Sequence, residues 1–238
     1  SIEELAKKST FEETSYLLLF GELPTKNELD EFTAKVTESR ELPADLIKIL
    51  KSLPKDTKPM DVLQMAVSSL GTFYDLEVSP EMVKGKKYNK DYFMNTSAAL
   101  IGALGSIVAA WHRIRNNQDP ISSKPESTYA ENFLLMLGAE KITPLMTRIM
   151  DATLVLHGEH TINASTFTAM VTSSTLANAS QVVASAIGSL SGPLHGGANE
   201  KVVSMLSKID SKDDIRPWLD DTLKAKNVVW GMGHREYS

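Results

Sequence analysis

The sequence predicts an all-α protein, and three observations support that prediction. Apolar residues recur at helical spacing, as at Leu29, Phe32 and Val36. Helix-starting patterns, a Ser or Thr with a Glu three positions later, recur near the beginning of the chain. Strand signals are sparse, since no hairpin dipeptide lies between alternating runs and only residues 228–230 make a short candidate strand.

The first part of the chain predicts five helices. Ser1 with Glu4 is a capping box that opens the first helix, and the same pattern opens the second and third. Proline, which a first helical turn tolerates, opens the fourth and fifth. These helices begin at Ser1, Thr10, Thr25, Pro43 and Pro59. Residues 78–90 are polar and predict an exposed connection or a short solvated helix.

A long helix over residues 92–115 is predicted to be central, because its middle is apolar nearly all round. Its longest apolar stretch, Ala98 to Trp111, has 14 residues, whereas a membrane-spanning helix needs roughly 20. We therefore expect a buried helix and no membrane segment. Further helices are predicted over residues 126–138, 143–160, 164–190, 197–208 and 213–226.

The composition argues against several classes of function. Lys and Arg total 25 and Asp and Glu total 30, which gives a net charge of −5 and no basic footprint for nucleic acid. The chain has no Cys, which removes disulfides, thiol catalysis and thiolate metal sites and fits a reducing compartment. No charged-then-apolar leader opens the sequence, so we expect a cytoplasmic protein.

Between Thr172 and Gly192 the residues are mostly Ala, Ser, Thr and Gly. Small side chains let the backbone of one helix approach another closely. The segment therefore predicts a tight helix–helix contact, either inside the chain or between two subunits.

Two of the five histidines, His157 and His160, are three residues apart and are predicted to share a helix face. That spacing could hold a metal with Glu159, but no third ligand is evident, and we expect no metal site. His157 alone fits a hydrogen-bonded core histidine better.

His195 lies among Pro193 and the glycines at 192, 196 and 197, directly before a predicted helix. Glycines allow a ligand to approach the backbone closely, and a helix N-terminus disfavours the imidazolium form. A neutral His195 could donate a hydrogen bond to a carbonyl oxygen that becomes an enolate. The alternative is an ordinary histidine in a Gly-rich turn.

His234 stands in a second Gly-rich segment, Gly-Met-Gly-His-Arg at residues 231–235. Alternating glycines expose backbone groups beside an imidazole and a cation, which suits an anionic ligand. His195 and His234 lie about 40 residues apart in similar Gly-rich segments. The occurrence of both is stronger evidence for a site than either histidine alone.

Three segments together resemble the citrate synthase family. They are HGEHTINAST at residues 157–166, GPLHGGAN at 192–199 and GMGHR at 231–235. SIEELA at residues 1–6, LPT at 23–25 and PMD at 59–61 resemble its bacterial and archaeal branch. The resemblance covers essentially the whole chain. It implies an acyltransferase of the tricarboxylic acid cycle that condenses acetyl-CoA with oxaloacetate and hydrolyses the citryl thioester. It also implies no metal and no permanently bound cofactor, with a coenzyme A thioester as co-substrate.

The resemblance assigns roles to individual residues. His195 would hydrogen-bond the acetyl carbonyl oxygen and stabilise the enol, and His234 would supply a proton to the oxaloacetate carbonyl. His160 would bind oxaloacetate. The residues that resemble the family's coenzyme A contacts are Leu194, Val228, Val229, Gly231 and Gly233.

The resemblance also implies an arrangement of domains and subunits. Residues 1–200 would form most of a large helical domain, and residues 201–238 would begin a smaller domain that closes over substrate. The family is dimeric through helices of the large domain, which gives the small-residue segment a subunit partner.

This sequence departs from the family at the third segment and at its ends. Met232 stands where the family usually has an aromatic or smaller apolar residue, and Glu236 stands where it has an aliphatic one. The family's catalytic aspartate and its oxaloacetate-clamping arginines lie beyond Ser238, so the chain is expected to be truncated at both ends. Two alternatives stay open: a 2-methylcitrate synthase using propionyl-CoA, or a non-catalytic helical fragment that keeps the scaffold and dimer surface.

Overall fold

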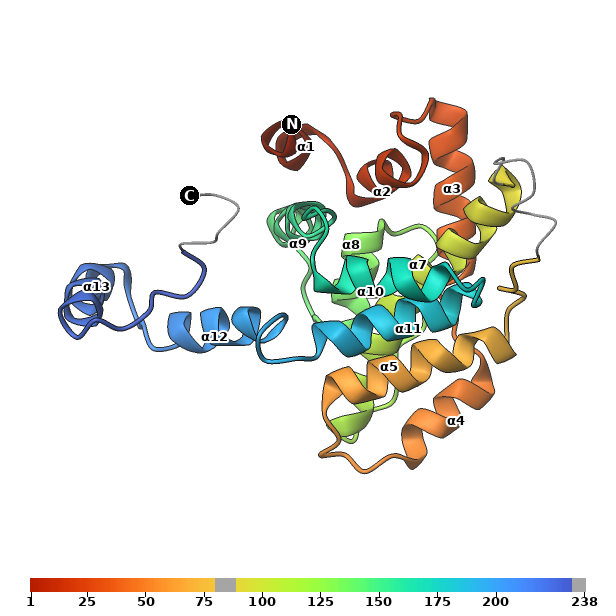
Figure 1. The fold of residues 1–238 in the computed structure, drawn as a ribbon. Coiled ribbons are helices and arrows are strands. Elements are labelled where there is room, and N and C mark those ends of the chain that lie inside the picture. Colours follow the sequence, from red (N-terminus) through yellow and green to blue (C-terminus); the bar gives the residue numbers. More distant parts are fainter. Residues whose placement is uncertain (80–88, 233–238) are drawn as a thin grey trace. The chain divides into compact units, whose positions relative to one another are not determined.

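The computed structural model describes residues 1–79 and 89–232 and divides the chain into two compact units. Unit 1 is Ser1–Ile187, and unit 2 is Gly188–Ser238. The described residues form helices, turns and loops, and no strand is found among them (Figure 1). The all-α class predicted from the sequence is confirmed.

The described residues of unit 1 form eight α-helices before α10, ordered along the chain much as the sequence predicts. They are α1 (Ile2–Lys8), α2 (Phe11–Phe20), α3 (Lys26–Glu38), α4 (Ala44–Ser52), α5 (Pro59–Ser69), α7 (Lys90–Arg115), α8 (Tyr129–Leu137) and α9 (Pro144–Leu156). A short 3-10 helix, η1 (Leu70–Thr72), follows α5. The unit is completed by α10 (Ala164–Ser173) and most of α11 (Ala179–Leu190). Unit 2 contains α12 (Gly197–Leu206), η3 (Lys212–Asp214) and α13 (Ile215–Lys224).

The residues that mark helix starts in the sequence do cap the first turns. Thr25 and Glu28 form a reciprocal capping box, in which the Thr25 N–H donates to Glu28 Oε2 at 2.9 Å. Thr10 Oγ1 accepts from the backbone N–H of Glu13 at 3.2 Å. Each cap satisfies an N–H that has no partner inside its own helix. Similar side-chain caps precede α8, α9 and α10 at Thr128, Thr143 and Asn163.

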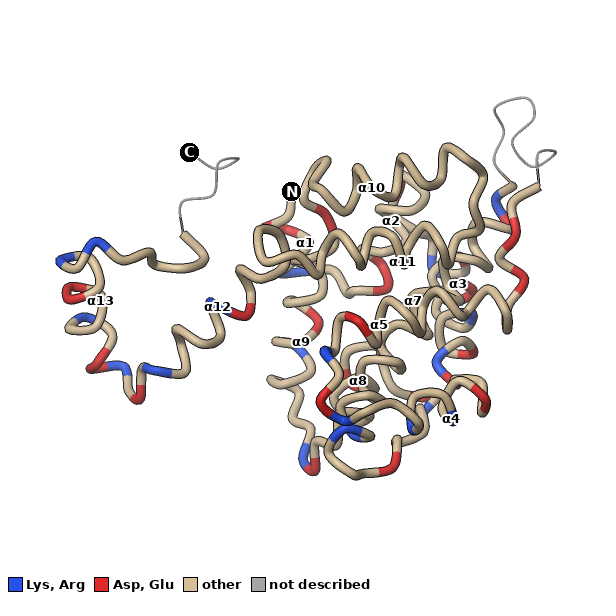
Figure 2. Tube along the Cα trace, turned by 60° about the horizontal axis from the view of Figure 1, so that its bottom comes forward, with Lys and Arg blue, Asp and Glu red and all other residues tan. Residues whose placement is uncertain are grey.

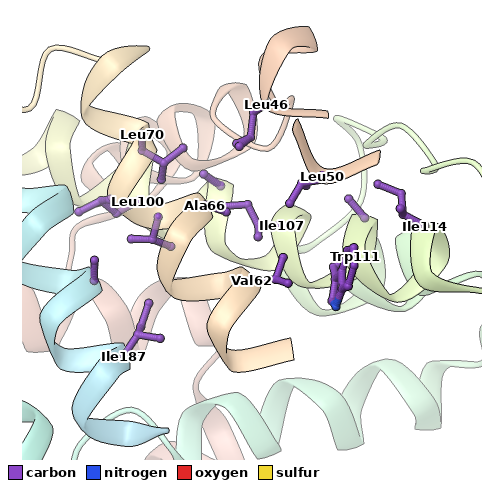
Figure 3. Close-up of a cluster of buried hydrophobic side chains, with 14 of the residues drawn as sticks. Leu46, Leu50, Val62, Ala66, Leu70, Leu100, Ile107, Trp111, Ile114 and Ile187 are labelled. Atoms are coloured by element: carbon purple, nitrogen blue, oxygen red, sulfur yellow. The ribbon is translucent and has the colours of Figure 1, made fainter. Parts of the chain in front are cut away.

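The helix α7 is the centre of unit 1, as its apolar middle predicts. It is long and apolar enough to cross a membrane by length and composition, yet its side chains form the middle of a buried cluster. Ile107 and Trp111 of α7 pack there with Leu50 of α4 and Val62 of α5 (Figure 3). Burial of this apolar surface is the main force that assembles the unit.

A second cluster joins α2 and α3 to α7. Tyr16 and Phe32 are fully buried there and meet edge to face, with ring centroids 5.9 Å apart. Gly102 permits the close approach of α7 to α3, because a Cβ at that position would lie 2.5 Å from the carbonyl oxygen of Val36. A side chain at residue 102 would therefore push the two helices apart.

The small-residue segment differs from the single helix predicted over residues 164–190. The helix is interrupted at residues 174–178, where Leu176 has a left-handed backbone at φ 61°. Asn178 then begins α11, since its Oδ1 accepts from Ser180 Oγ at 2.7 Å and from the Gln181 N–H at 3.1 Å. Periodicity alone missed this break because Thr, Leu and Ala on either side are all compatible with a helix.

One face of α11 packs inside unit 1. Ser180, Ala184 and Ile187 are buried, and Ala184 and Ile187 belong to the same cluster as α5 and α7. A Cβ on Gly71 would lie 2.8 Å from Ser180 Oγ, so the two backbones approach closely. Neither α10 nor α11 carries a charged residue (Figure 2). A tight helix contact inside the chain is confirmed, and the contact of this segment with a second subunit stays a prediction.

Other boundaries also differ from the prediction. Residues 228–230, the one candidate strand, are extended and turn residues with no strand partner in the described part of the chain. The predicted domain boundary at residue 200 falls inside α12, whereas the compact units divide before Gly188. The functional domains of residues 1–200 and 201–238 stay a prediction.

Candidate functional site

The first predicted histidine segment lies in unit 1, where α9 ends. The helix stops at Leu156, so His157 and His160 do not share a helix face, and that part of the prediction is wrong. His157 is the C-cap of α9, and its Nδ1 lies 2.7 Å from the carbonyl oxygen of Thr153, to which it donates. His157 is exposed, so it stabilises a helix end and is not a core histidine.

His160 lies half-buried in the turn between α9 and α10. The next residue, Thr161, has a left-handed backbone at φ 55°, and its N–H donates to the carboxylate of Glu159. Asn163 ends the turn by accepting from the Thr166 N–H at 3.0 Å. The side chains on both sides of His160 therefore fix the backbone from which its imidazole projects. Within residues 1–79 and 89–232, no three His, Asp or Glu side chains cluster as metal ligands would.

The second segment places His195 in unit 2, directly before α12. Its backbone N–H donates to Gly192 O at 3.0 Å, and the Gly196 N–H donates to Leu190 O at 3.0 Å. This compact turn lets the helix begin at Gly197, as the sequence predicts. No side chain caps α12, so its first N–H groups keep the partial positive charge of a helix N-terminus.

Leu194, beside His195, is fully exposed, with 103% of its reference surface accessible. Leucine gains nothing from contact with water. A side chain in this position is therefore available to pack against the apolar part of a bound molecule.

The third segment is a loop over residues 228–232, also in unit 2. Its turn is closed by a hydrogen bond from the Met232 N–H to Val229 O at 3.4 Å, and Gly231 has φ +91°. That backbone conformation favours glycine. Trp230 lies beneath the ammonium group of Lys201 from α12, with Nζ 4.1 Å from the ring centroid. Gly233 and His234 lie outside the described residues.

A cavity of about 580 Å³ lies between α12, α13 and this loop. Lys201 and Lys208 provide cations on its wall, and Trp218 and Trp230 provide aromatic surface. These residues are not identifiable from the sequence, because nothing in the spacing of Lys201 and Trp230 indicates that the two side chains meet. The only sign of this loop in the sequence is the pair of glycines that follows Trp230, at residues 231 and 233.

The structure also contains a buried charged cluster that the sequence does not reveal. Arg40 is 2% exposed, and its Nη1 donates to Ser127 O at 2.9 Å. Its Nη2 lies 4.0 Å from Glu12 Oε1, while the same oxygen accepts from the Tyr129 N–H at 2.7 Å. Burial raises the pKa of the Tyr129 hydroxyl to about 12. The cluster ties α2 and the start of α8 to the segment just after α3, and it is a feature of the fold.

The site residues are therefore distributed over both units. His160 belongs to unit 1, whereas His195, Leu194 and the loop of residues 228–232 belong to unit 2. In unit 2, one helix connects the histidine to the loop, because α12 begins just after His195 and carries Lys201.

The family profile for the citrate synthase C-terminal domain matches residues 1–238. A citrate synthase from Acidithiobacillus ferridurans is 42% identical over 237 residues, which are 100% of this chain and 61% of that protein. 2-Methylcitrate synthase 2 from Corynebacterium glutamicum is 38% identical over 245 residues, covering 100% of this chain and 61% of that protein.

A solved structure is also similar. It is the ternary complex of citrate synthase from Thermoplasma acidophilum with carboxymethyl coenzyme A and oxaloacetate, with a TM-score of 0.81 and 29% identity. The match covers 99% of this chain and 60% of that one. The chain thus spans about 60% of the length of the relatives it matches.

Proposed function

Because the chain belongs to the citrate synthase family, we propose that its protein condenses acetyl-CoA with oxaloacetate to form citrate and free coenzyme A. The observation that carries the proposal is the compact turn that holds His195 in front of the uncapped N-terminus of α12. An imidazole there is close to fixed backbone amides and can donate to a developing enolate oxygen. The similar Thermoplasma protein binds both a coenzyme A derivative and oxaloacetate.

The histidines have distinct roles in this proposal. His195 stabilises the enol of the acetyl group, which is necessary because a carbon next to a thioester loses its proton reluctantly. His234 supplies a proton to the oxaloacetate carbonyl as the new carbon–carbon bond forms. His160 binds oxaloacetate, for which its position in a firmly braced turn is suitable.

Coenzyme A is the co-substrate, and no permanently bound cofactor or metal takes part in the proposal. Val228, Val229, Gly231 and Gly233 contact it through the loop backbone, and Leu194 contacts it through its side chain. The full exposure of Leu194 and the left-handed backbone of Gly231 support these assignments.

A second activity has support from a specific observation. Some relatives of similar identity are 2-methylcitrate synthases, so propionyl-CoA is the alternative acyl donor. The two donors differ by one methylene, and a pocket distinguishes such a difference by about 1–3 kcal/mol. The ratio of kcat/KM for acetyl-CoA and propionyl-CoA decides between the two activities.

The test of the main proposal is a thiol-release assay of the protein as the cell makes it, with both substrates present. His195→Ala should lower kcat by about 10²–10³-fold, the effect of removing one donor to a developing oxyanion. The melting temperature should stay close to wild type, because the imidazole is only half-buried. Near-normal kcat in this variant would contradict the role, and absence of turnover in the wild type would favour the non-catalytic alternative.

We also propose a cytoplasmic homodimer, which uses neither nucleic acid nor a membrane as a partner. The acidic composition supports the absence of a nucleic-acid partner, and the lack of cysteine supports the cytoplasmic location. Higher assembly stays open.

A further inference from the structure

The helix α12 touches both parts of the proposed site that lie in unit 2. Its first residue, Gly197, follows His195 by two positions. One turn later, Lys201 and Val202 reach the loop of residues 228–232. A single short helix therefore fixes the spacing between the imidazole and the loop.

Two adjacent contacts connect α12 to that loop. Lys201 Nζ lies over the face of Trp230, 4.1 Å from its centroid, well inside the range of a cation–π contact. A Cβ on Gly231 would lie 3.4 Å from Val202 Cγ2, so the loop backbone itself packs against the helix. Gly231 is also the residue with φ +91°, at the point where the turn reverses.

We propose that Lys201 is a positioning residue for coenzyme A binding. By holding Trp230 against α12, it keeps the backbone of Val228 to Gly231 in the conformation that binds the coenzyme, at a fixed spacing from His195. This inference rests on the proposed function, because the loop's contact with coenzyme A is part of that proposal.

A simpler explanation is general attraction between lysines and an anionic ligand. Lys208 allows the two explanations to be separated, because it lines the same cavity as Lys201. The described contacts include a lysine–tryptophan interaction for Lys201 and none for Lys208. Removing either cation changes the charge of the cavity equally, whereas only Lys201 holds the loop.

The experiment measures the dissociation constant of coenzyme A by calorimetry for the full chain and four variants. Lys201→Met and Lys201→Gln should weaken binding about 2–5-fold, the equivalent of about 0.5–1 kcal/mol for an exposed cation–π contact. Lys201→Arg should restore wild-type affinity, because a guanidinium also stacks on tryptophan. Lys208→Met should bind as the wild type does.

The measurement is repeated at about 0.5 M KCl, where the Debye length falls to about 4 Å and long-range attraction is screened. A persistent difference between wild type and Lys201→Met supports positioning. An equal loss in Lys208→Met, or a difference that disappears in salt, would overturn it. If the wild type binds coenzyme A and Lys201→Met binds equally well, only the positioning role fails. If the wild type binds no coenzyme A, the proposed coenzyme site and this inference both fail.

Discussion

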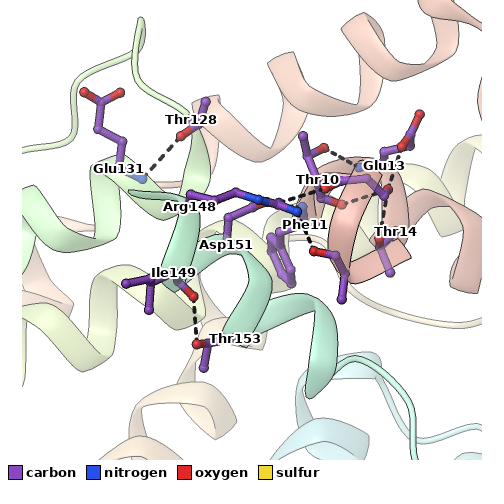
Figure 4. Close-up of polar contacts among 12 residues, drawn as sticks. Thr10, Phe11, Glu13, Thr14, Thr128, Glu131, Arg148, Ile149, Asp151 and Thr153 are labelled. Carbon is purple, nitrogen blue, oxygen red and sulfur yellow. Dashed lines mark hydrogen bonds and ion pairs between the residues drawn. The ribbon is translucent and has the colours of Figure 1, made fainter. Parts of the chain in front are cut away.

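Asp151 of α9 accepts a hydrogen bond from the backbone N–H of Phe11, the first residue of α2, at 2.8 Å (Figure 4). Its other carboxylate oxygen accepts from Arg148 Nη1 at 3.0 Å. Arg148 also donates to the carbonyl oxygens of Ser9 and Ala6. One carboxylate and one guanidinium thus join α9 to α1, to the start of α2 and to the turn between them, about 140 residues earlier in the chain.

Asp151→Ala should lower the free energy of unfolding by about 1–3 kcal/mol, because it leaves a first-turn N–H of α2 without its acceptor. Urea denaturation of the full chain measures the loss. Asp56→Ala is the matched control, since Asp56 is exposed, and should stay within about 0.5 kcal/mol of wild type. Equal stability of the two variants would show that the link between α9 and α2 contributes little.

The contrast between Thr25 and Asp151 shows how far the sequence predicts the fold. The Thr25 cap involves residues three positions apart, so local chemistry is enough to predict it. The partner of Asp151 is 140 positions away, and no local pattern identifies it. The break at Leu176 is not predictable from periodicity, because the residues on either side of it are all compatible with a helix.

The candidate site likewise contains residues that local sequence predicts and residues that it does not. Glycines and the following helix mark His195 in the sequence, and the structure confirms that it directly precedes a helix. The chemistry of Lys201 was not predictable, since its contact with Trp230 depends on how the chain returns after α13. The sequence predicts a core position for His157, but α9 ends at Leu156, four residues before the predicted helix end, and leaves His157 exposed.

The hydrogen-bonded carboxylate of Glu28 should make part of the folding stability depend on pH. Hydrogen bonds from the backbone N–H and then the hydroxyl of Thr25 hold its pKa near 2, below the ordinary value of 4.5. A lowered pKa in the folded state stabilises the protein above pH 4.5, and this contribution is lost as the pH falls toward 2. Glu28→Gln should therefore lower the melting temperature at pH 6, and the difference should shrink steadily in acid.

Thr25→Ala supplies the control for that titration. Thr25→Ala removes the hydroxyl that donates to Glu28 and so removes half of the capping box. Glu28→Gln should therefore lower the melting temperature less in the Thr25→Ala background than in the wild type. Melting curves between pH 2 and pH 7 measure both differences. A Glu28→Gln effect that is constant over this range would contradict the assignment.

His157 and His160 should respond differently to alanine. His157→Ala removes the bond to Thr153 O at an exposed helix end and should cost about 0.5–1 kcal/mol of stability. His160→Ala should raise the KM for oxaloacetate about 10–100-fold, the equivalent of losing a hydrogen bond to a charged ligand. The KM for the acyl-CoA should change less. If the two variants exchange these effects, the roles have been assigned to the wrong histidines.

The proposed homodimer is best tested on α7. Ala184, in the small-residue segment, is only 4% exposed, so a bulky residue there would disturb the fold of the chain itself. Val108 is 40% exposed in the middle of the long helix α7, where a subunit contact could cover it. Val108→Asp should weaken dimerisation at least 10-fold in sedimentation equilibrium, with little change in unfolding. A wild-type monomer, or a dimer indifferent to Val108→Asp, would contradict the proposal.

A polypeptide of residues 1–238 alone should not complete the condensation. In the proposed mechanism His195 stabilises an enol, but a base must first remove the methyl proton, and the resemblance to the family implies that this base is a carboxylate outside residues 1–238. Loss of a general base lowers the rate by about 10²–10⁴-fold. The described residues of α12 and α13 include none that are buried, and Ile215 and Leu223 are 48% and 57% exposed.

Such a polypeptide should therefore also bind a hydrophobic dye, and amide exchange in α12 and α13 should be much faster than in α7. Intact mass verifies its length, and thiol release with both substrates measures its chemistry. The protein as the cell makes it, assayed in parallel, is the control for active substrates. Robust turnover by a verified 238-residue polypeptide would show that one of its own carboxylates serves as the base. Asp210, Asp213 and Asp214 would then be the first residues to replace, since they follow His195 in unit 2.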